Sequence, residues 1–205
     1  MSIRGRRRAR NRPTENRFVR QSVRSIQREV TMVSRNQLTK RLPQPLRFGG
    51  QPGLREYNKS IKRLGNDDEE AFRLNVIAAE QGMHDAVLAM GWFYLNGAGV
   101  EADLDEAIRW YKKAARHGEV MAFFSLGQIA FSQKDFAEAI LWLGRAAAKG
   151  HSRSKFYLGK LYWRGEGVEQ NRKPARKLFA EAAACNVFEA QRTERFLSFL
   201  GSRTV

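Results

Sequence analysis

Small and apolar residues recur at a fixed spacing through the second half of the chain. From Ala107, small residues follow seven, eight and eleven positions later, at Ala114, Ala115 and Gly118. Three further alanines begin the same series, with Asn186 replacing the glycine of the last one: Ala71, Ala139 and Ala175. The four starting alanines are separated by 36, 32 and 36 residues. A period of this length is typical of solenoids that are built from helical hairpins.

Each of the three later periods contains a second helical pattern upstream of its alanine. Apolar residues there follow the three- and four-residue spacing of a buried helical stripe. A glycine stands at the same place in each pattern, at Gly91, Gly127 and Gly159. Glycine inside a helix costs about 1 kcal/mol relative to alanine, so we expect a neighbouring backbone to come close at these positions. The pattern predicts an all-α fold of paired helices.

Two of the predicted hairpins carry a G-x-G segment between their helices, at Gly97 and Gly99 and at Gly165 and Gly167. A phosphate-binding loop opens onto a helix N-terminus and is usually followed by Lys and by Ser or Thr. Acidic residues follow here instead, at Glu101 and at Glu169. The G-x-G segments are therefore interpreted as turns between helices.

These residues resemble the Sel1-like repeats, which are relatives of the tetratricopeptide repeats. The resemblance covers roughly residues 65 to 190, and the middle unit departs from it because "FSQKDF" replaces the G-x-G segment. It implies a short right-handed α-solenoid that has no enzymatic activity and binds no cofactor. The matching residues of one unit are Gly91, Tyr94, Gly97, Gly99, Val100, Ala107, Trp110, Tyr111, Ala114, Ala115 and Gly118.

Candidate catalytic or metal-binding groups are few. The three histidines, His84, His117 and His151, fall at hairpin ends without a second ligand at metal spacing. The only cysteine, Cys185, follows an alanine-rich helix and does not stand in an activating context. We expect no catalytic residue, no metal site and no cofactor.

Charge divides the chain into two parts. Residues 1–63 hold 18 Lys and Arg against three acids, which is +15 of the total net charge of +16. Four of the five prolines also lie before residue 53. We expect a basic N-terminal arm and linker over residues 1–53, and a solenoid with a C-terminal capping helix over residues 54–205. No apolar run reaches the roughly 20 residues of a membrane span, and a cytoplasmic location is expected, with organellar import as an alternative.

The arm contains one amphipathic pattern. Val19, Val23, Ile26, Val30 and Val33 are spaced by four and three residues, which predicts a basic amphipathic helix at about residues 15–42. Such a helix can contact a protein, an anionic membrane or nucleic acid, or dock onto the solenoid in cis. The candidate contact residues of the whole basic arm are Arg6, Arg7, Arg8, Arg10, Arg12, Arg17, Arg20, Arg24 and Arg28.

The resemblance also implies a binding surface, because the first helix of each hairpin lines the concave groove in tetratricopeptide-like solenoids. The alternative is that the aromatic residues of this set pack between adjacent repeats. Two functions follow: an adaptor that holds a partner protein or peptide in the groove, with the arm as second contact, or a protein that binds nucleic-acid phosphates through the arm. The implied groove residues are Leu88, Trp92, Leu95, Asn96, Phe124, Gln128, Phe131, Phe156, Lys160, Trp163 and Arg164.

Overall fold

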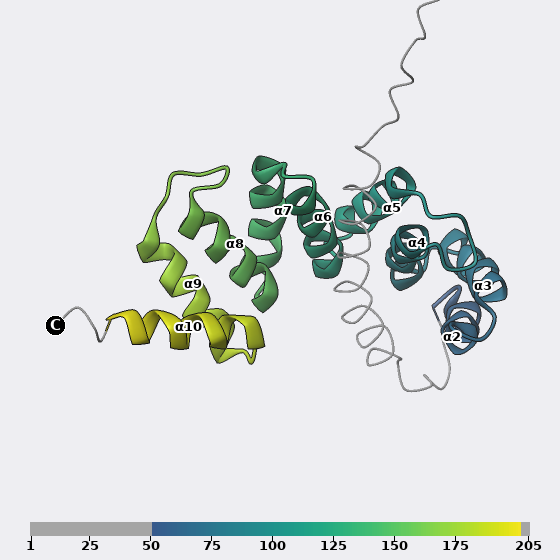
Figure 1. The fold of residues 1–205 in the computed structure, drawn as a ribbon. Coiled ribbons are helices and arrows are strands. Elements are labelled where there is room, and N and C mark those ends of the chain that lie inside the picture. The colour runs from purple at the N-terminus through teal and green to yellow at the C-terminus, as the bar shows by residue number, and fades with distance from the viewer. Residues whose placement is uncertain (1–50, 202–205) are drawn as a thin grey trace, which may run out of the picture.

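The computed structural model describes residues 51–201, and all of the regular structure in that range is helical (Figure 1). The amphipathic segment and the arginines of the arm lie outside the described residues. None of the helices in residues 51–201 has both the length and the apolar character that crossing a bilayer requires. The helices are α2 (Leu54–Arg63), α3 (Asp68–Glu80), α4 (His84–Asn96), α5 (Leu104–Arg116), α6 (Val120–Ser132), α7 (Phe136–Ala148), α8 (Ser152–Arg164), α9 (Arg172–Ala184) and α10 (Phe188–Gly201).

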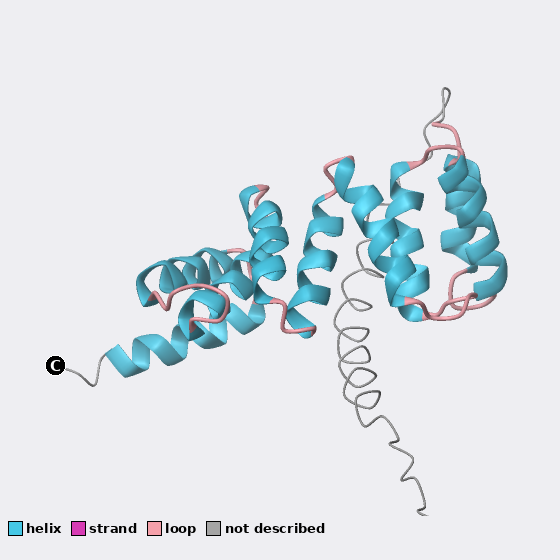
Figure 2. Ribbon diagram, turned by 90° about the horizontal axis from the view of Figure 1, so that it is seen from above, coloured by secondary structure: helices cyan, strands magenta, loops and turns pink. Residues whose placement is uncertain are grey.

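The described helices pair into four hairpins that stack along one direction. The pairs are α2 with α3, α4 with α5, α6 with α7, and α8 with α9, and α10 packs on α9 at the C-terminal end. Each helix contacts the next one along the chain, so the assembly is elongated (Figures 1 and 2). The architecture is the α-solenoid that the repeat period predicts.

Short polar side chains begin the second helix of every hairpin. Asp67, Asp103, Asp135 and Asn171 each accept a hydrogen bond from a backbone amide of the first helical turn. Such caps satisfy amide groups that have no partner within the helix. At the other end of the last of these helices, Asn186 adopts φ 60°. This left-handed conformation confirms that Asn186 takes the place of the glycine in the other units.

The helix glycines make room for a side chain from the second helix of the same hairpin. A Cβ atom added to Gly91 would lie 2.6 Å from the Tyr111 ring, and one on Gly159 would lie 2.7 Å from the Phe179 ring. At Gly127 the nearest atom belongs to Leu143, again at 2.6 Å. The expected close approach therefore involves mainly a bulky side chain, which stands four residues after the alanine that starts each repeat series. These side chains are Tyr111 after Ala107, Leu143 after Ala139 and Phe179 after Ala175. The neighbouring backbone contributes only at Gly127, where the Leu143 nitrogen would be 3.1 Å away.

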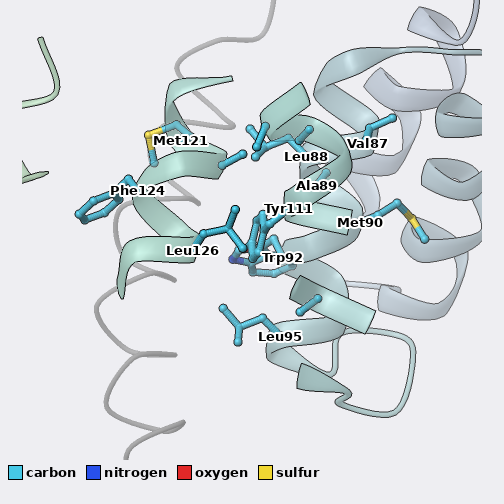
Figure 3. Close-up of a cluster of buried hydrophobic side chains, with 14 of the residues drawn as sticks. Val87, Leu88, Ala89, Met90, Trp92, Leu95, Tyr111, Met121, Phe124 and Leu126 are labelled. Atoms are coloured by element: carbon cyan, nitrogen blue, oxygen red, sulfur yellow. The ribbon is translucent and has the colours of Figure 1, made fainter. Parts of the chain in front are cut away.

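The core runs continuously from α2 to α8. One cluster of buried side chains extends from Tyr57 in α2 to Leu161 in α8, and Figure 3 draws its central part. A smaller cluster joins α9 to the C-terminal helix through Ala182, Val187 and Ala190. Because each hairpin covers the apolar face of its neighbour, stability depends on contacts between consecutive units.

The hairpin loops differ in length, and this difference shapes the surface. The loop between α4 and α5 packs against the preceding hairpin, since a Cβ on Gly99 would collide with the Asp68 carbonyl group. In the same way, Gly167 of the α8–α9 loop approaches Phe136 at the start of α7. Only residues 133–135 join α6 to α7. The middle hairpin thus has no loop that reaches back to its predecessor.

Candidate partner-binding surface

The proposed groove residues of α4 are largely covered. Leu88, Trp92 and Leu95 are 9%, 6% and 1% exposed, and Asn96 is half-buried. Figure 3 draws Trp92 in the same buried cluster as Tyr111. The side-chain nitrogen Nδ2 of Asn96 donates a hydrogen bond of 2.8 Å to the Trp92 carbonyl oxygen. This end of the surface offers little side-chain area to a partner in the conformation described.

On α6 the polar and aromatic residues are shared between core and surface. Phe124 and Gln128 are buried, whereas Phe131 is half-buried. The Gln128 Nε2 atom donates to the Tyr157 hydroxyl group at 3.3 Å, while Gln128 Oε1 has no hydrogen-bond partner. The indole Nε1 of Trp92 is likewise buried without a partner. A buried polar atom in this state costs about 1–3 kcal/mol.

The residues of α8 form the accessible part of the predicted set. Phe156, Lys160 and Trp163 are half-buried, and Arg164 is exposed. The Lys160 ammonium lies 5.0 Å from the centroid of the Phe131 ring and 5.8 Å from that of Phe156. These distances are within the range of cation–π attraction, which holds the cation beside the rings. The structure therefore brings Phe131, Phe156 and Lys160 together on neighbouring helices.

Two residues that the sequence reasoning did not include complete this surface. The Tyr157 ring lies 5.3 Å from that of Phe131 and 5.1 Å from the Lys160 ammonium. The Arg172 guanidinium, from the start of α9, lies 5.2 Å from the Trp163 ring. Tyr157 adjoins Phe156 in sequence, so a wider helical stripe could have found it. Nothing in the sequence pattern pointed to Arg172, because the α8–α9 loop brings it back to Trp163. We call these residues the α8 face: Phe131, Phe156, Tyr157, Lys160, Trp163, Arg164 and Arg172.

The displaced pKa values in residues 51–201 have structural causes. Burial raises the pKa of the Tyr111 phenol well above its usual range. Burial, together with the positive charge of Arg153, lowers the pKa of His151 to about 4. The hydrogen bond and charge of Lys155, 2.7 Å away, lower the pKa of Glu181. These groups are therefore explained by packing and by one ion pair between α8 and α9.

The histidines occupy the hairpin ends, as the sequence indicates. The rings of His84 and His117 are stacked with their centroids 4.2 Å apart, and both side chains are exposed. His151 caps α8, where its Nδ1 atom accepts from the Ser154 amide at 3.3 Å. Within the described range, no three His, Cys, Asp or Glu side chains are placed to share a metal ion.

Comparison with known families agrees with the repeat geometry. The Sel1 repeat model matches residues 84–119, 123–151 and 152–187, which correspond to the α4–α5, α6–α7 and α8–α9 hairpins. The chain belongs to the Sel1 repeat family. The α2–α3 hairpin adds a further helical pair before the matched units.

Solved structures with the same architecture support this assignment. One is c5321, a protective antigen of uropathogenic Escherichia coli with an SLR fold, at 27% identity and a TM-score of 0.66. The match covers 74% of this chain and 34% of the c5321 chain. Another is a Sel1 repeat protein from Oxalobacter formigenes, at 27% identity and a TM-score of 0.61. That match covers 72% of this chain and 45% of the Oxalobacter protein.

Two curated relatives are regulators, and the similarity to them is local. A chitin synthase regulator SKT5 from Malassezia restricta is 40% identical over 67 residues, or 33% of this chain and 5% of the regulator. The chitin synthase regulator SKT5 of Saccharomyces cerevisiae is 35% identical over 60 residues, which are 29% of this chain and 9% of the regulator. The chain thus spans less than a tenth of either regulator. Sel1 solenoids commonly serve as scaffolds for protein interaction.

Proposed function

We propose that this Sel1-repeat protein is an adaptor that binds a partner protein or peptide on the concave side of the solenoid. The observation that carries the proposal is the α8 face, where accessible aromatic rings lie beside Lys and Arg. Aromatic residues and arginine are the types most enriched at the energetic centres of protein interfaces. The half-buried rings of Phe156 and Trp163 supply apolar area, and Lys160, Arg164 and Arg172 supply positive charge.

The charge of this face defines the complementary partner. An amphipathic helix or extended peptide would place apolar side chains on the rings and acidic side chains beside the cations. The deeper residues of the proposed groove, Trp92, Phe124 and Gln128, are buried and hold the helices that present the face. Contact between these residues and a partner requires the neighbouring side chains to move, so their role is support in the first place.

The proposal is tested with acidic amphipathic peptides selected from a displayed random library against the full chain. Trp163→Ala should weaken peptide binding by at least about tenfold, which corresponds to roughly 1.4 kcal/mol of binding free energy. The matched control is Trp110→Ala, which removes a half-buried tryptophan from α5, where it packs with Lys113 at 4.7 Å. Fluorescence anisotropy measures both. Equal losses in the two variants would contradict binding at the α8 face.

The basic arm gives the second contact in this proposal. Residues 1–53 hold 14 Lys and Arg against two acids, a net charge of +12, and this charge also supports the alternative function, in which the arm binds nucleic-acid phosphates. Ionic strength separates the two, because phosphate-driven affinity falls by orders of magnitude between about 50 and 200 mM salt. Binding to an adaptor peptide should change far less over the same range, and residues 54–205 should keep most of it. A steep salt slope that is lost in residues 54–205 would favour the nucleic-acid alternative.

A further inference from the structure

A notch opens beside α6, on a side of this helix that does not carry Phe131. It lies between α5 and α7, which are the second helices of two consecutive hairpins. Its volume is about 360 Å³, and its apolar wall includes Ile108 of α5, Ala130 of α6 and Trp142 of α7. Leu126 and Ile129 form its floor. This stripe of α6 is different from the stripe that carries Phe124, Gln128 and Phe131. The notch is therefore independent of the surface assigned to the proposed function.

Comparison of the repeats shows why this space is open. Backbone hydrogen bonds align the hairpins: Asp103 N donates to Tyr94 O at 3.0 Å, and Asp135 N donates to Ala130 O at 3.0 Å. Ala130 thus stands where the preceding hairpin has Tyr94. The Tyr94 ring packs edge-on against Phe72 of the previous unit, with centroids 5.6 Å apart. At the next interface along the stack, the equivalent of Phe72 is Ile108 of α5.

The aromatic cluster of one interface is therefore missing from the next. Phe72 also contacts Phe93 at 5.7 Å, and Phe93 aligns with Ile129. Three rings at the α3–α4–α5 junction are replaced by two isoleucines and one alanine at the α5–α6–α7 junction. The long loop is absent as well, because only residues 133–135 join α6 to α7. Both changes remove atoms from the same region, which leaves the notch.

The rim of the notch is polar, and its charges balance. Lys112, Gln133, Asp135 and Glu138 line it. Glu138 Oε1 accepts a hydrogen bond of 2.6 Å from the indole nitrogen of Trp142, which fixes both side chains. The Arg145 guanidinium lies 4.7 Å from the centroid of the Trp142 ring, so two cations stand beside the two acids. The hydroxyl group of an inserted phenol can pair with this polar rim.

We propose that the notch accepts a tyrosine or phenylalanine side chain of a partner protein. The inserted ring takes the place that Tyr94 occupies in the preceding repeat. A volume near 360 Å³ lies at the lower end of ligand pockets, which run from about 300 to 1,000 Å³. It therefore suits one ring and the adjoining backbone. The proposal adds a second interaction surface to the scaffold.

The test uses p-cresol, the tyrosine side chain, as a probe of the full chain. The indole N–H signal of Trp142, assigned by its loss in Trp142→Phe, should shift saturably with a millimolar dissociation constant, as expected for a ligand this small. Absence of a saturable shift would overturn the proposal.

Filling the notch provides the second arm of the test. Ala130→Tyr restores the ring of the preceding repeat and should abolish p-cresol binding without lowering the melting temperature. Ile108→Phe restores the opposite wall and decides the matter if Ala130→Tyr does not fold. Ala180→Tyr is the matched control, since Ala180 is exposed on α9 outside the notch. If p-cresol binds a folded notch variant as it binds the control, the probe site lies elsewhere and the proposal fails. Trp163→Ala should leave p-cresol binding unchanged, so the notch and the α8 face are tested separately.

Discussion

Replacement of the helix glycines by alanine tests the packing rule of this solenoid most directly. In an open helical position, glycine to alanine should stabilise the protein by about 1 kcal/mol. Gly144, within α7, is such a position, because an added Cβ would meet no atom within 4 Å. At Gly91 the same atom would lie 2.6 Å from two carbons of the Tyr111 ring. That ring is 1% exposed.

The two substitutions should therefore differ in their effect on stability. Gly91→Ala has the same helix-propensity gain as Gly144→Ala, but overpacking of a tight core costs about 1–3 kcal/mol. The free energy of unfolding of Gly91→Ala should thus lie about 1–3 kcal/mol below that of Gly144→Ala. For a domain of this size, 1 kcal/mol corresponds to about 2–4 °C in melting temperature. Urea unfolding followed by circular dichroism gives the free energies, and an unchanged m-value shows that the unfolded state is not the cause.

A double-mutant cycle identifies the responsible contact. Tyr111→Leu by itself should destabilise the protein, because it removes part of a buried ring. In the Gly91→Ala background the same change should cost less, since it also relieves the collision. If Gly91→Ala stabilises the protein as much as Gly144→Ala does, or if the two sites show no coupling, then Gly91 is not retained to make room for Tyr111.

The remaining predictions concern the core, the C-terminal helix and pH. Trp92→Ala should cost about 3–5 kcal/mol of stability in urea unfolding, while Trp163→Ala should cost about 1–2 kcal/mol because its ring is only half-buried; similar losses would contradict the assigned burial. Truncation after Asn186 removes the buried Val187 and should cost at least about 1.5–3 kcal/mol, so an unchanged melting temperature would refute a stabilising role for the C-terminal helix. The pKa of His151 is lowered from 6.5 to about 4 in the folded protein, so its contribution to stability is complete above pH 6.5 and is lost as pH falls toward 4. The loss should reach at most about 3.4 kcal/mol at 1.36 kcal/mol per pKa unit, and His151→Asn should flatten this part of the stability–pH curve; an unchanged curve would contradict this origin.

The sequence by itself determined the repeat, the helix pairing and the helix ends. Alanines at a period of 36, 32 and 36 residues and glycines in a common register can be recognised because a solenoid repeats the same local contacts in each unit. The left-handed conformation at Asn186 also followed from sequence, since it depends on its immediate neighbours.

Only the tertiary structure decided which residues of a stripe are covered. Leu95 and Trp163 stand at equivalent places in their helices, four residues after the helix glycine, yet Leu95 is 1% exposed and Trp163 is half-buried. Exposure depends on what the adjacent unit presents, and adjacent units differ in loop length and side-chain size. The position of Arg172 over Trp163 likewise depends on the path of a loop. The notch beside Ala130 exists because two units that are similar in sequence pack with unequal volumes, and a pattern of residue types along one chain contains no measure of that space.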